Sequence, residues 1–299
     1  MGNAPPPAGA AASLKGPLLI ILAIALFSAN DVAMKLLSAG FGAAQVITWR
    51  CTVGLLLMGP AAFAHLSRTG GIPRARLKLQ LLRGVLIHCS GLTFFVAFAR
   101  LPLFDAYVVF FSAPFVTLGL VRVMLGEAVR RAAWGWAALG FGGVALAMAQ
   151  GLSGRGDLVG YLCAALGTCS YATLMVVTRW LGPDARLAEG MAIPALLGVA
   201  VIGPFAVAGW SLPSLADAGL LSLTGALWAM GNVSLAAAIR AASPARLAPY
   251  DFTAMLWAVI YDAAFFATTP GALELAGAAV VLTACLGHAR SDQRAERAG

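Results

Sequence analysis

Several ionisable and polar side chains interrupt stretches of the chain that are otherwise almost entirely apolar. Asn30 and Asp31 lie side by side in residues 17–37, and Arg50 lies in the next apolar stretch, 43–63. An aspartate in such surroundings could line a binding cavity and hold a substrate ammonium group. It could instead form an ion pair with a neighbouring arginine, which would neutralise both charges. The residue types leave both interpretations open for Asp31, with Arg50 as its partner in the second.

Two further acids lie in one apolar stretch near the end of the chain. Asp251 and Asp262 are eleven residues apart, which places them on nearly the same face of a helix with about 3.6 residues per turn. Tyr250, Trp257 and Tyr261 form the adjacent stripe. Aromatic side chains often anchor helix ends at a membrane interface, which explains Tyr250 but not Trp257 in the middle of the stretch. We therefore favour a cavity face that carries aromatics and acids.

Other candidates for binding a small molecule lie in the middle of the chain. His88 aligns with Trp228 at an offset of 140 residues, and Asn232 follows Trp228 by one helical turn. A lone buried histidine is more often a packing residue than a ligand-binding one, so both roles stay open for His88. Phe94 and Phe111 offer flat apolar surface on which an aromatic ring could stack.

The composition places all these residues in a membrane protein. The 299 residues are 61% hydrophobic and 11% charged, and the mean hydropathy is +0.87. A soluble domain has about 25% charged residues, so this chain has too few charges to coat a soluble globule. A helix needs about 20 apolar residues to cross a bilayer. We predict an all-α integral membrane protein with ten transmembrane helices, at about 17–37, 43–63, 81–99, 103–124, 132–150, 158–179, 190–209, 215–239, 247–267 and 271–288.

Most of the basic residues fall between the apolar stretches. With the N-terminus inside the cell, 16 of the 20 Lys and Arg residues fall on the cytoplasmic side, three fall outside, and one lies within a span. Because Lys and Arg gather in cytoplasmic loops, this asymmetry predicts a multi-pass protein of a bacterial-type inner (plasma) membrane with both termini cytoplasmic. The net charge of +8 therefore sets orientation, and nucleic acid is excluded as a partner. The outer residues are Lys35, Arg100 and Arg155, and Arg50 lies within its span.

The sequence contains no motif of an enzyme, a metal site or an ATPase. All five cysteines fall inside predicted spans, without metal-ligand spacing and away from outer loops in which a disulfide would form. There is no H-E-x-x-H motif, no nucleophile elbow and no Walker A sequence. A channel would need rings of like polar residues, which the scattered aromatics of this sequence fit poorly. We therefore predict no cofactor and no catalytic role.

The two halves of the chain resemble each other. Lys35 precedes Arg179 by 144 residues, and Gly91 precedes Gly231 by 140. Five spans per half is an odd number, so the second copy would begin on the opposite side of the membrane and lie inverted. Inverted repeats place the binding site near the midplane between the halves. The predicted organisation is a disordered cytoplasmic tail over 1–16, five-helix repeats over 17–150 and 157–288, and a cytoplasmic tail over 289–299.

The motif at 248–258, Ala-Pro-Tyr-Asp-Phe-Thr-Ala-Met-Leu-Trp-Ala, resembles the opening of the ninth helix in the drug/metabolite transporter superfamily, specifically its ten-helix EamA-type members. Pro114, the Leu-Gly-Glu sequence that ends at Glu127, and Trp134 are similar to the pattern of the fourth and fifth helices in that family. Arg50 matches an arginine typical of the second helix.

The chain also departs from the family's pattern. The family repeats Gly-Glu at the end of the ninth helix, where this chain has Ala267 and Thr268, and Phe27 stands where a tryptophan is common. A glutamate that is absent from one copy cannot be assigned a proton-coupling role, so we expect transport without obligatory proton coupling.

The resemblance implies a secondary transporter of small metabolites that works by alternating access, and it is closest to exporters of amino acids. We predict export of neutral or aromatic amino acids, with a drug or nucleotide derivative as the alternative and a membrane-embedded enzyme or a channel as weaker ones. Both a monomer and a homodimer are compatible with the sequence. The predicted substrate-binding residues are Asn30, Asp31, His88, Phe94, Phe111, Trp228, Asn232, Tyr250 and Trp257.

The charge asymmetry makes the topology directly testable. We expect a cysteine introduced into the C-terminal tail to react with a membrane-impermeant reagent only from the cytoplasmic side, because the basic loops hold both termini inside. Labelling of loop cysteines should map an even number of spans. An odd number of spans, or a tail that is labelled from outside, would contradict the prediction.

Overall fold

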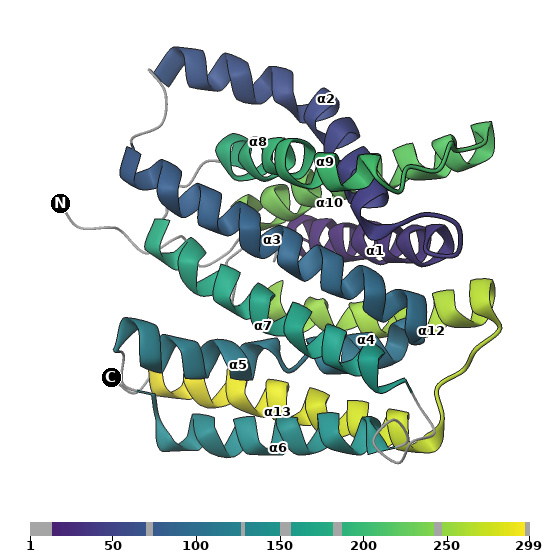
Figure 1. Ribbon diagram of the computed structural model, residues 1–299. Helices are drawn as coiled ribbons and strands as arrows, with labels where there is room; N and C mark the ends of the chain where they lie inside the picture. The colour runs from purple at the N-terminus through teal and green to yellow at the C-terminus, as the bar shows by residue number, and fades with distance from the viewer. Residues whose placement is uncertain are drawn as a thin grey trace.

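In the computed structural model the chain forms a bundle of helices, and its described residues, 14–69, 74–126, 129–149, 157–181, 187–241 and 247–296, contain no strand. Figure 1 shows the helices lying roughly alongside one another across the molecule. The spans are α1 (Lys15–Leu37), α2 (Ala43–Thr69), α3 (Arg74–Arg100), α4 with α5 and η1 (Leu103–Phe110, Ala113–Leu120, Val121–Leu125), α6 (Arg131–Ala147), α7 (Leu158–Leu181), α8 with η3 and α9 (Leu187–Leu197, Gly198–Ile202, Gly203–Val207), α10 (Leu215–Ala241), η4 with α12 (Ala248–Phe252, Thr253–Phe266) and α13 (Ala272–Glu296).

The all-helical membrane architecture predicted from composition is confirmed. Each of the ten predicted stretches coincides with a helical segment of the described chain. Seven helices in these ranges are long and apolar enough to cross a membrane by themselves, and the stretch Ala192–Val207 is a shorter apolar segment. The segments α6 and α12 are short, with 17 and 14 residues.

The connection between the second and third predicted spans is largely helical. The predicted spans end at 63 and begin again at 81, but α2 continues to Thr69 and α3 begins at Arg74. Charged residues end an apolar stretch without ending a helix, because the backbone hydrogen bonds of a helix are made within the segment whether lipid or water surrounds it. Both helices therefore extend beyond their apolar windows.

Prolines mark the interruptions within two spans. Pro114 lies in the first turn of α5, directly after the break that separates α5 from α4. Pro194 lies inside α8, and a π-helical segment, η3, follows before Pro204 opens α9. A proline lacks the backbone N–H that would continue the hydrogen-bond ladder, so these positions are natural bends.

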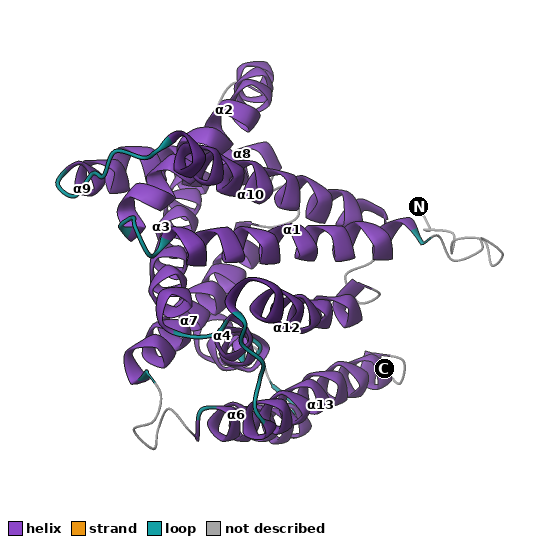
Figure 2. Cartoon of the chain, turned by 90° about the vertical axis from the view of Figure 1, so that its right-hand side faces the viewer, coloured by secondary structure: helices purple, strands orange, loops and turns teal. Residues whose placement is uncertain are grey.

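Each half of the chain packs mainly against the other half. Helix α1 lies against α10, and α3 lies against α7; α6 and α13 form a third close pair, visible together at one side of the bundle in Figures 1 and 2. The segment α2 contacts α8, and α4 contacts α12. The beginning of α1 and the end of α13 lie at the same end of the bundle (Figure 2), as an even number of crossings requires.

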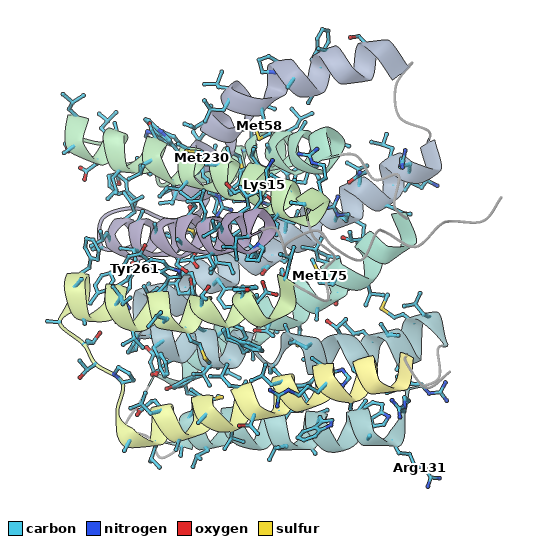
Figure 3. All side chains as sticks on the ribbon, turned by 180° about the vertical axis from the view of Figure 1, so that it is seen from behind. Lys15, Met58, Arg131, Met175, Met230 and Tyr261 are labelled. Atoms are coloured by element: carbon cyan, nitrogen blue, oxygen red, sulfur yellow. The ribbon has the colours of Figure 1, made fainter. Side chains whose placement is uncertain are left out.

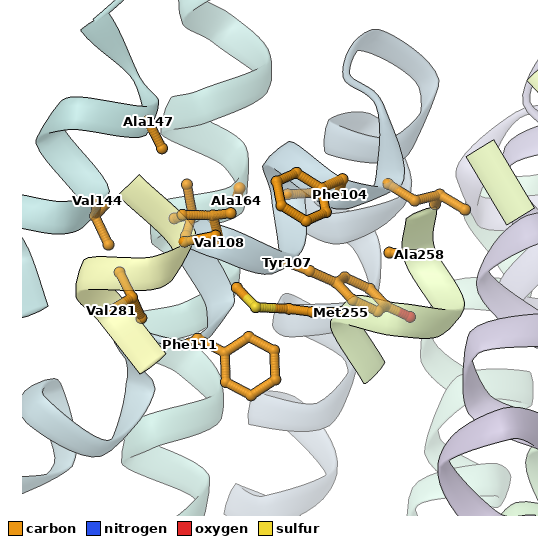
Figure 4. Packing of buried hydrophobic residues seen from close by; sticks show 14 of the residues in the cluster. Phe104, Tyr107, Val108, Phe111, Val144, Ala147, Ala164, Met255, Ala258 and Val281 are labelled. Carbon is orange, nitrogen blue, oxygen red and sulfur yellow. The ribbon is translucent and has the colours of Figure 1, made fainter. Parts of the chain in front are cut away.

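The largest apolar core surrounds α4. Phe104, Tyr107, Val108 and Phe111 of α4 pack with residues of α6, α7, α12 and α13 (Figure 4). The α6–α13 pair is tight because it is built on glycine: a Cβ added to Gly143 would lie 2.8 Å from the carbonyl oxygen of Gly277 on α13. Small residues permit such close approach in membranes.

Polar contacts tie the two halves together at the end of the bundle where α1 finishes, which we call the Lys35 end. Asp262 of α12, with an exposed fraction of 1%, accepts hydrogen bonds from the backbone N–H groups of Leu103 at 3.0 Å and Phe104 at 2.8 Å. It therefore caps the first turn of α4, whose N–H groups have no partners within the helix. The Lys35 ammonium donates to the carbonyl oxygen of Leu101, and its Nζ lies 4.8 Å from the centroid of the Phe266 ring.

Two more contacts at the Lys35 end join the halves near the start of α7. The Tyr161 hydroxyl donates to Asp105 at 2.9 Å. Arg100 forms an ion pair with Asp157 at 2.8 Å. Hydrogen bonds from the Gly160 backbone N–H and from Arg100 lower the pKa of Asp157, which stays ionised at neutral pH.

We expect Asp262→Ala to lower the thermal stability of the protein in detergent. The substitution leaves two buried N–H groups of α4 without an acceptor, at a cost of about 1–3 kcal/mol. Asp217→Ala is the matched control, because its carboxylate accepts from Ser214 at the start of α10 in exposed hydrogen bonds that water can replace. If the two variants lose equal stability, the capping role is wrong.

Candidate functional site

A hydrogen-bonded group joins α1 to α4 inside the bundle. The Tyr107 hydroxyl donates to Asp31 Oδ2 at 2.6 Å and lies 3.2 Å from Ser28 Oγ. Asn30 Nδ2 donates to Asp31 Oδ1 at 3.2 Å. Asp31 thus has a donor on each carboxylate oxygen, while the buried Asn30 Oδ1 accepts no hydrogen bond. This atom is an unused acceptor in an apolar interior.

The ion pair that the sequence left open for Asp31 is not formed. Arg50, with an exposed fraction of 7%, donates from Nη1 to Met34 Sδ at 3.4 Å, and Met34 Sδ also accepts from Asn30 at 3.4 Å. No carboxylate of the described chain lies within ion-pair distance of Arg50. The thioether therefore separates the guanidinium from the Asn30–Asp31 group.

Trp228 is a second neighbour of the Arg50 guanidinium. Arg50 Cζ is 6.0 Å from the centroid of the Trp228 ring, a cation–π distance. The ring packs against α2 at Gly54, where an added Cβ would lie 3.0 Å from it. Asn232, the other predicted residue of α10, donates from its amide to the carbonyl oxygen of Trp228 at 2.8 Å, so its donor serves the helix itself.

Aromatic rings from both halves meet beside this polar group. Phe94 and Tyr171 lie on either side of Phe110, with centroid distances of 5.7 and 4.9 Å, and Phe110 contacts Phe111. Phe111 in turn lies 5.5 Å from Phe252 in the other half. The chain of rings crosses the interface between α3, α4, α7 and η4.

Trp257 packs against the apolar cluster to which α1 contributes Ile20 and Ile24. Its ring stacks on Tyr261 with centroids 5.8 Å apart, and its buried Nε1 has no hydrogen-bond partner. Figure 3 places Tyr261 on the side of α12 that faces α1. Buried polar atoms in proteins are nearly always paired, so an unpaired indole N–H is a donor available to a ligand or water.

The two remaining predicted residues have other neighbours than Asn30 and Asp31. His88 Nε2 lies 2.7 Å from the carbonyl oxygen of Pro194, and His88 lines a cavity of about 370 Å³ between α2, α3 and the α8–α9 span. Tyr250 packs, as Trp257 does, against an apolar cluster that contains Ile20 and Ile24 near the start of α1.

The two acids of the ninth span do not share one environment as their spacing predicted. Asp251 is exposed in the 3₁₀ segment η4, whereas Asp262 is buried and caps α4. A 3₁₀ segment has about three residues per turn, fewer than an α-helix. The spacing that would place Asp251 and Asp262 on one face of a continuous α-helix therefore does not hold across η4. The shared face that the spacing predicted for Asp251 and Asp262 is thus not formed.

Sequence reasoning missed Tyr107 and Met34. Both residues read as ordinary members of apolar stretches, and their role depends on which helix lies opposite. A tyrosine in the middle of an apolar span was the available signal, because a buried phenolic hydroxyl usually has a partner.

Comparison with known proteins identifies relatives over nearly the whole chain. Residues 14–149 match the model of the EamA-like transporter family. A pseudopaline exporter of Pseudomonas aeruginosa is 26% identical over 92% of this chain and 96% of its own length. A riboflavin transporter of Rhizobium johnstonii is 27% identical over 94% of this chain and 93% of its own. An S-adenosylmethionine uptake transporter of Rickettsia felis is 24% identical over 92% of each chain.

A solved crystal structure shares the fold. It superposes on this chain with a TM-score of 0.63 and 15% sequence identity, over 97% of this chain and 100% of the other.

A double-mutant cycle on Tyr107→Phe and Asp31→Asn tests the α1–α4 hydrogen bond. We expect the two substitutions to be coupled by about 1–3 kcal/mol in the free energy of unfolding, because a buried hydrogen bond to a carboxylate is stronger than a neutral one. The measurement is reversible unfolding of the purified protein in detergent. Additive effects of the two substitutions would show that the hydroxyl and the carboxylate do not interact.

Proposed function

We propose that this chain, whose residues 14–149 match the EamA-like transporter family, is a transporter of the drug/metabolite transporter superfamily and exports neutral amino acids, aromatic ones included, across the membrane. The single observation that carries the proposal is that α1 and α12, which pack against each other, each carry a buried polar atom without a hydrogen-bond partner. Asn30 Oδ1 and Trp257 Nε1 are both buried without partners. The rings of Trp228, Trp257 and Phe111 lie on the spans around them.

The chemistry of these residues suits such a substrate. An aromatic amino acid needs flat apolar surface and a few polar groups, which is the usual make-up of a small-molecule site. Ring stacking contributes about 0.5–1.5 kcal/mol per pair beyond simple burial. Of the predicted residues, Asn30, Asp31, Phe94, Phe111, Trp228 and Trp257 form this proposed site. Asn232 and Tyr250 lie at its edges, and His88 faces the separate cavity.

The relatives themselves carry different cargoes. One is named for pseudopaline export, one for riboflavin and one for uptake of S-adenosylmethionine. Membership of the family therefore supports a small-molecule substrate, and the choice of amino acids rests on the site. A phosphorylated substrate or nucleotide sugar would need several basic partners, whereas the interior described here offers Arg50 alone.

We further propose that the halves 17–150 and 157–288 are inverted repeats that rock against each other around this site. The helix contacts support the duplication. Under an exchange of the halves, the α1–α10 contact becomes the α7–α3 contact, the α6–α13 pair maps onto itself, and the α4–α7 contact becomes the α12–α1 contact. In the orientation set by the basic loops, both termini are cytoplasmic and the Lys35 end faces outward.

We also propose that transport runs without obligatory proton coupling. The glutamate that the family repeats in its ninth helix is Thr268 here. Asp262 is occupied by the backbone of α4, and Asp31 is held by Tyr107 and Asn30.

Transport of labelled phenylalanine in liposomes tests the site. We expect Trp257→Ala to lower the initial rate at least about tenfold, since it removes both stacking surface and a buried donor. Trp134→Ala is the control, because Trp134 lies on α6 with 46% of its surface exposed. Each variant must elute as a single species in detergent before it is measured.

Two results would contradict the proposal. Unchanged phenylalanine transport by Trp257→Ala would refute the site, and wild-type protein that moves only phosphorylated compounds would refute the substrate class. An arm with an imposed pH gradient tests coupling: accumulation driven by the gradient and abolished in Asp31→Asn would overturn the uncoupled mechanism.

A further inference from the structure

We propose that Arg50 binds the carboxylate group of the transported molecule. This inference rests on the proposed function and deepens it, because it makes a carboxylate a required feature of the substrate. Arg50 lies seven residues into α2, which places its backbone about 10 Å along the helix from the Lys35 end, at a rise of about 1.5 Å per residue. It is thus inside the membrane, beside the group formed by Asn30 and Asp31.

Among the residues that the structure describes, the guanidinium of Arg50 has no carboxylate as a direct hydrogen-bond partner. Its described hydrogen-bond and cation–π contacts are the thioether of Met34, the thiol of Cys51 and the face of Trp228. It interacts with Asp31 and His88 only through their charges. Sulfur atoms are weak acceptors, and a guanidinium carries five N–H donors. Taking a charged group out of water costs several kcal/mol unless it is paired and hydrogen-bonded. A carboxylate, which can accept two parallel hydrogen bonds from the guanidinium, supplies that missing partner.

The neighbouring helices leave room for the guanidinium and hold it in place. Gly91 of α3 faces Arg50, and an added Cβ there would lie 3.3 Å from Nη2. Trp228 approaches through the gap left by Gly54 on α2 and covers the guanidinium face at 6.0 Å. A cation–π contact uses the face of the guanidinium and leaves its N–H edge available.

The groups around Arg50 also suit the other end of an amino acid. Met34 Sδ accepts from both Arg50 Nη1 and Asn30 Nδ2, each at 3.4 Å, so these two nitrogens are separated by no more than twice that distance. Asn30 Oδ1 is an unpaired acceptor, and Asp31 is its neighbour. In an amino acid, a single carbon joins the carboxylate to the ammonium. The carboxylate can therefore meet Arg50 while the ammonium meets Asn30 and Asp31.

A purely structural Arg50 is the competing explanation. In that case Asp31 would neutralise the guanidinium across Met34, and no substrate group would be needed. The two explanations differ in one measurable property: a carboxylate-binding Arg50 makes the protein discriminate between substrates that differ only in the carboxylate, and a structural Arg50 does not.

The test compares labelled phenylalanine with phenylalaninamide, which keeps the ring and the ammonium but lacks the negative charge. In liposomes we expect the wild type to prefer phenylalanine by more than about tenfold, as a charge-assisted bidentate pair would give. Arg50→Gln should reduce phenylalanine transport to the level of the amide and leave amide transport within about twofold of the wild type. Arg50→Lys should retain part of the preference, because it keeps the charge without the planar fork.

Arg83→Gln is the matched control and should keep the full preference. Arg83 is an arginine of α3, and its guanidinium donates a hydrogen bond to Gln80 on the same helix. Equal transport of phenylalanine and its amide by the wild type would overturn the inference and leave the proposed function standing, even if Arg50→Gln failed to fold. Retained preference in a folded Arg50→Gln would also overturn it. A wild type that moves neither compound would refute the proposed function, and the inference with it.

Discussion

The cost of an unsatisfied polar group in hydrocarbon is the constraint on which this structure depends. Water cannot rescue a break in a helix at membrane depth, so protein groups must do so. The fourth span begins at Leu103 and breaks between Phe110 and Ala113. Asp262 reaches across from α12 to cap the first turn of α4, and the hydroxyl of Ser112 donates to the carbonyl oxygen of Val109 at the break. The Asp262 carboxylate is thus one of the contacts that join the two halves at the Lys35 end.

The short helix α4 consequently links several parts of the bundle. Its backbone is held by α12, Tyr107 reaches α1, and Asp105 accepts from Tyr161 of α7. Its apolar face lies in the largest core, against α6 and α13. Any rocking of one half against the other must either carry α4 with both partners or break these contacts. Opening at the Lys35 end therefore requires that these contacts be broken.

Some buried groups escape this constraint. Asn30 Oδ1 and Trp257 Nε1 have no hydrogen-bond partner in the described part of the chain, and the buried Arg50 guanidinium donates to a thioether, which is a weak acceptor. Each such group in a native fold calls for an explanation, and a transported molecule that visits the site during the cycle is the one proposed here.

The sequence by itself determined the membrane class, the positions of the spans, the prolines at their breaks and the family resemblance, because hydropathy and motifs are properties of the chain in order. Only the tertiary structure decided which polar residues meet. Spacing placed Asp31 within reach of Arg50 on the next helix, yet Asp31 bonds to Tyr107 on α4, and Met34 stands between the two charges. Spacing likewise put Asp251 and Asp262 on one face, whereas the 3₁₀ turn of η4 and the open end of α4 separated their roles. The position of a residue along a helix follows from its number, but its partner follows from which helices pack side by side, and that choice is made by all the side chains together.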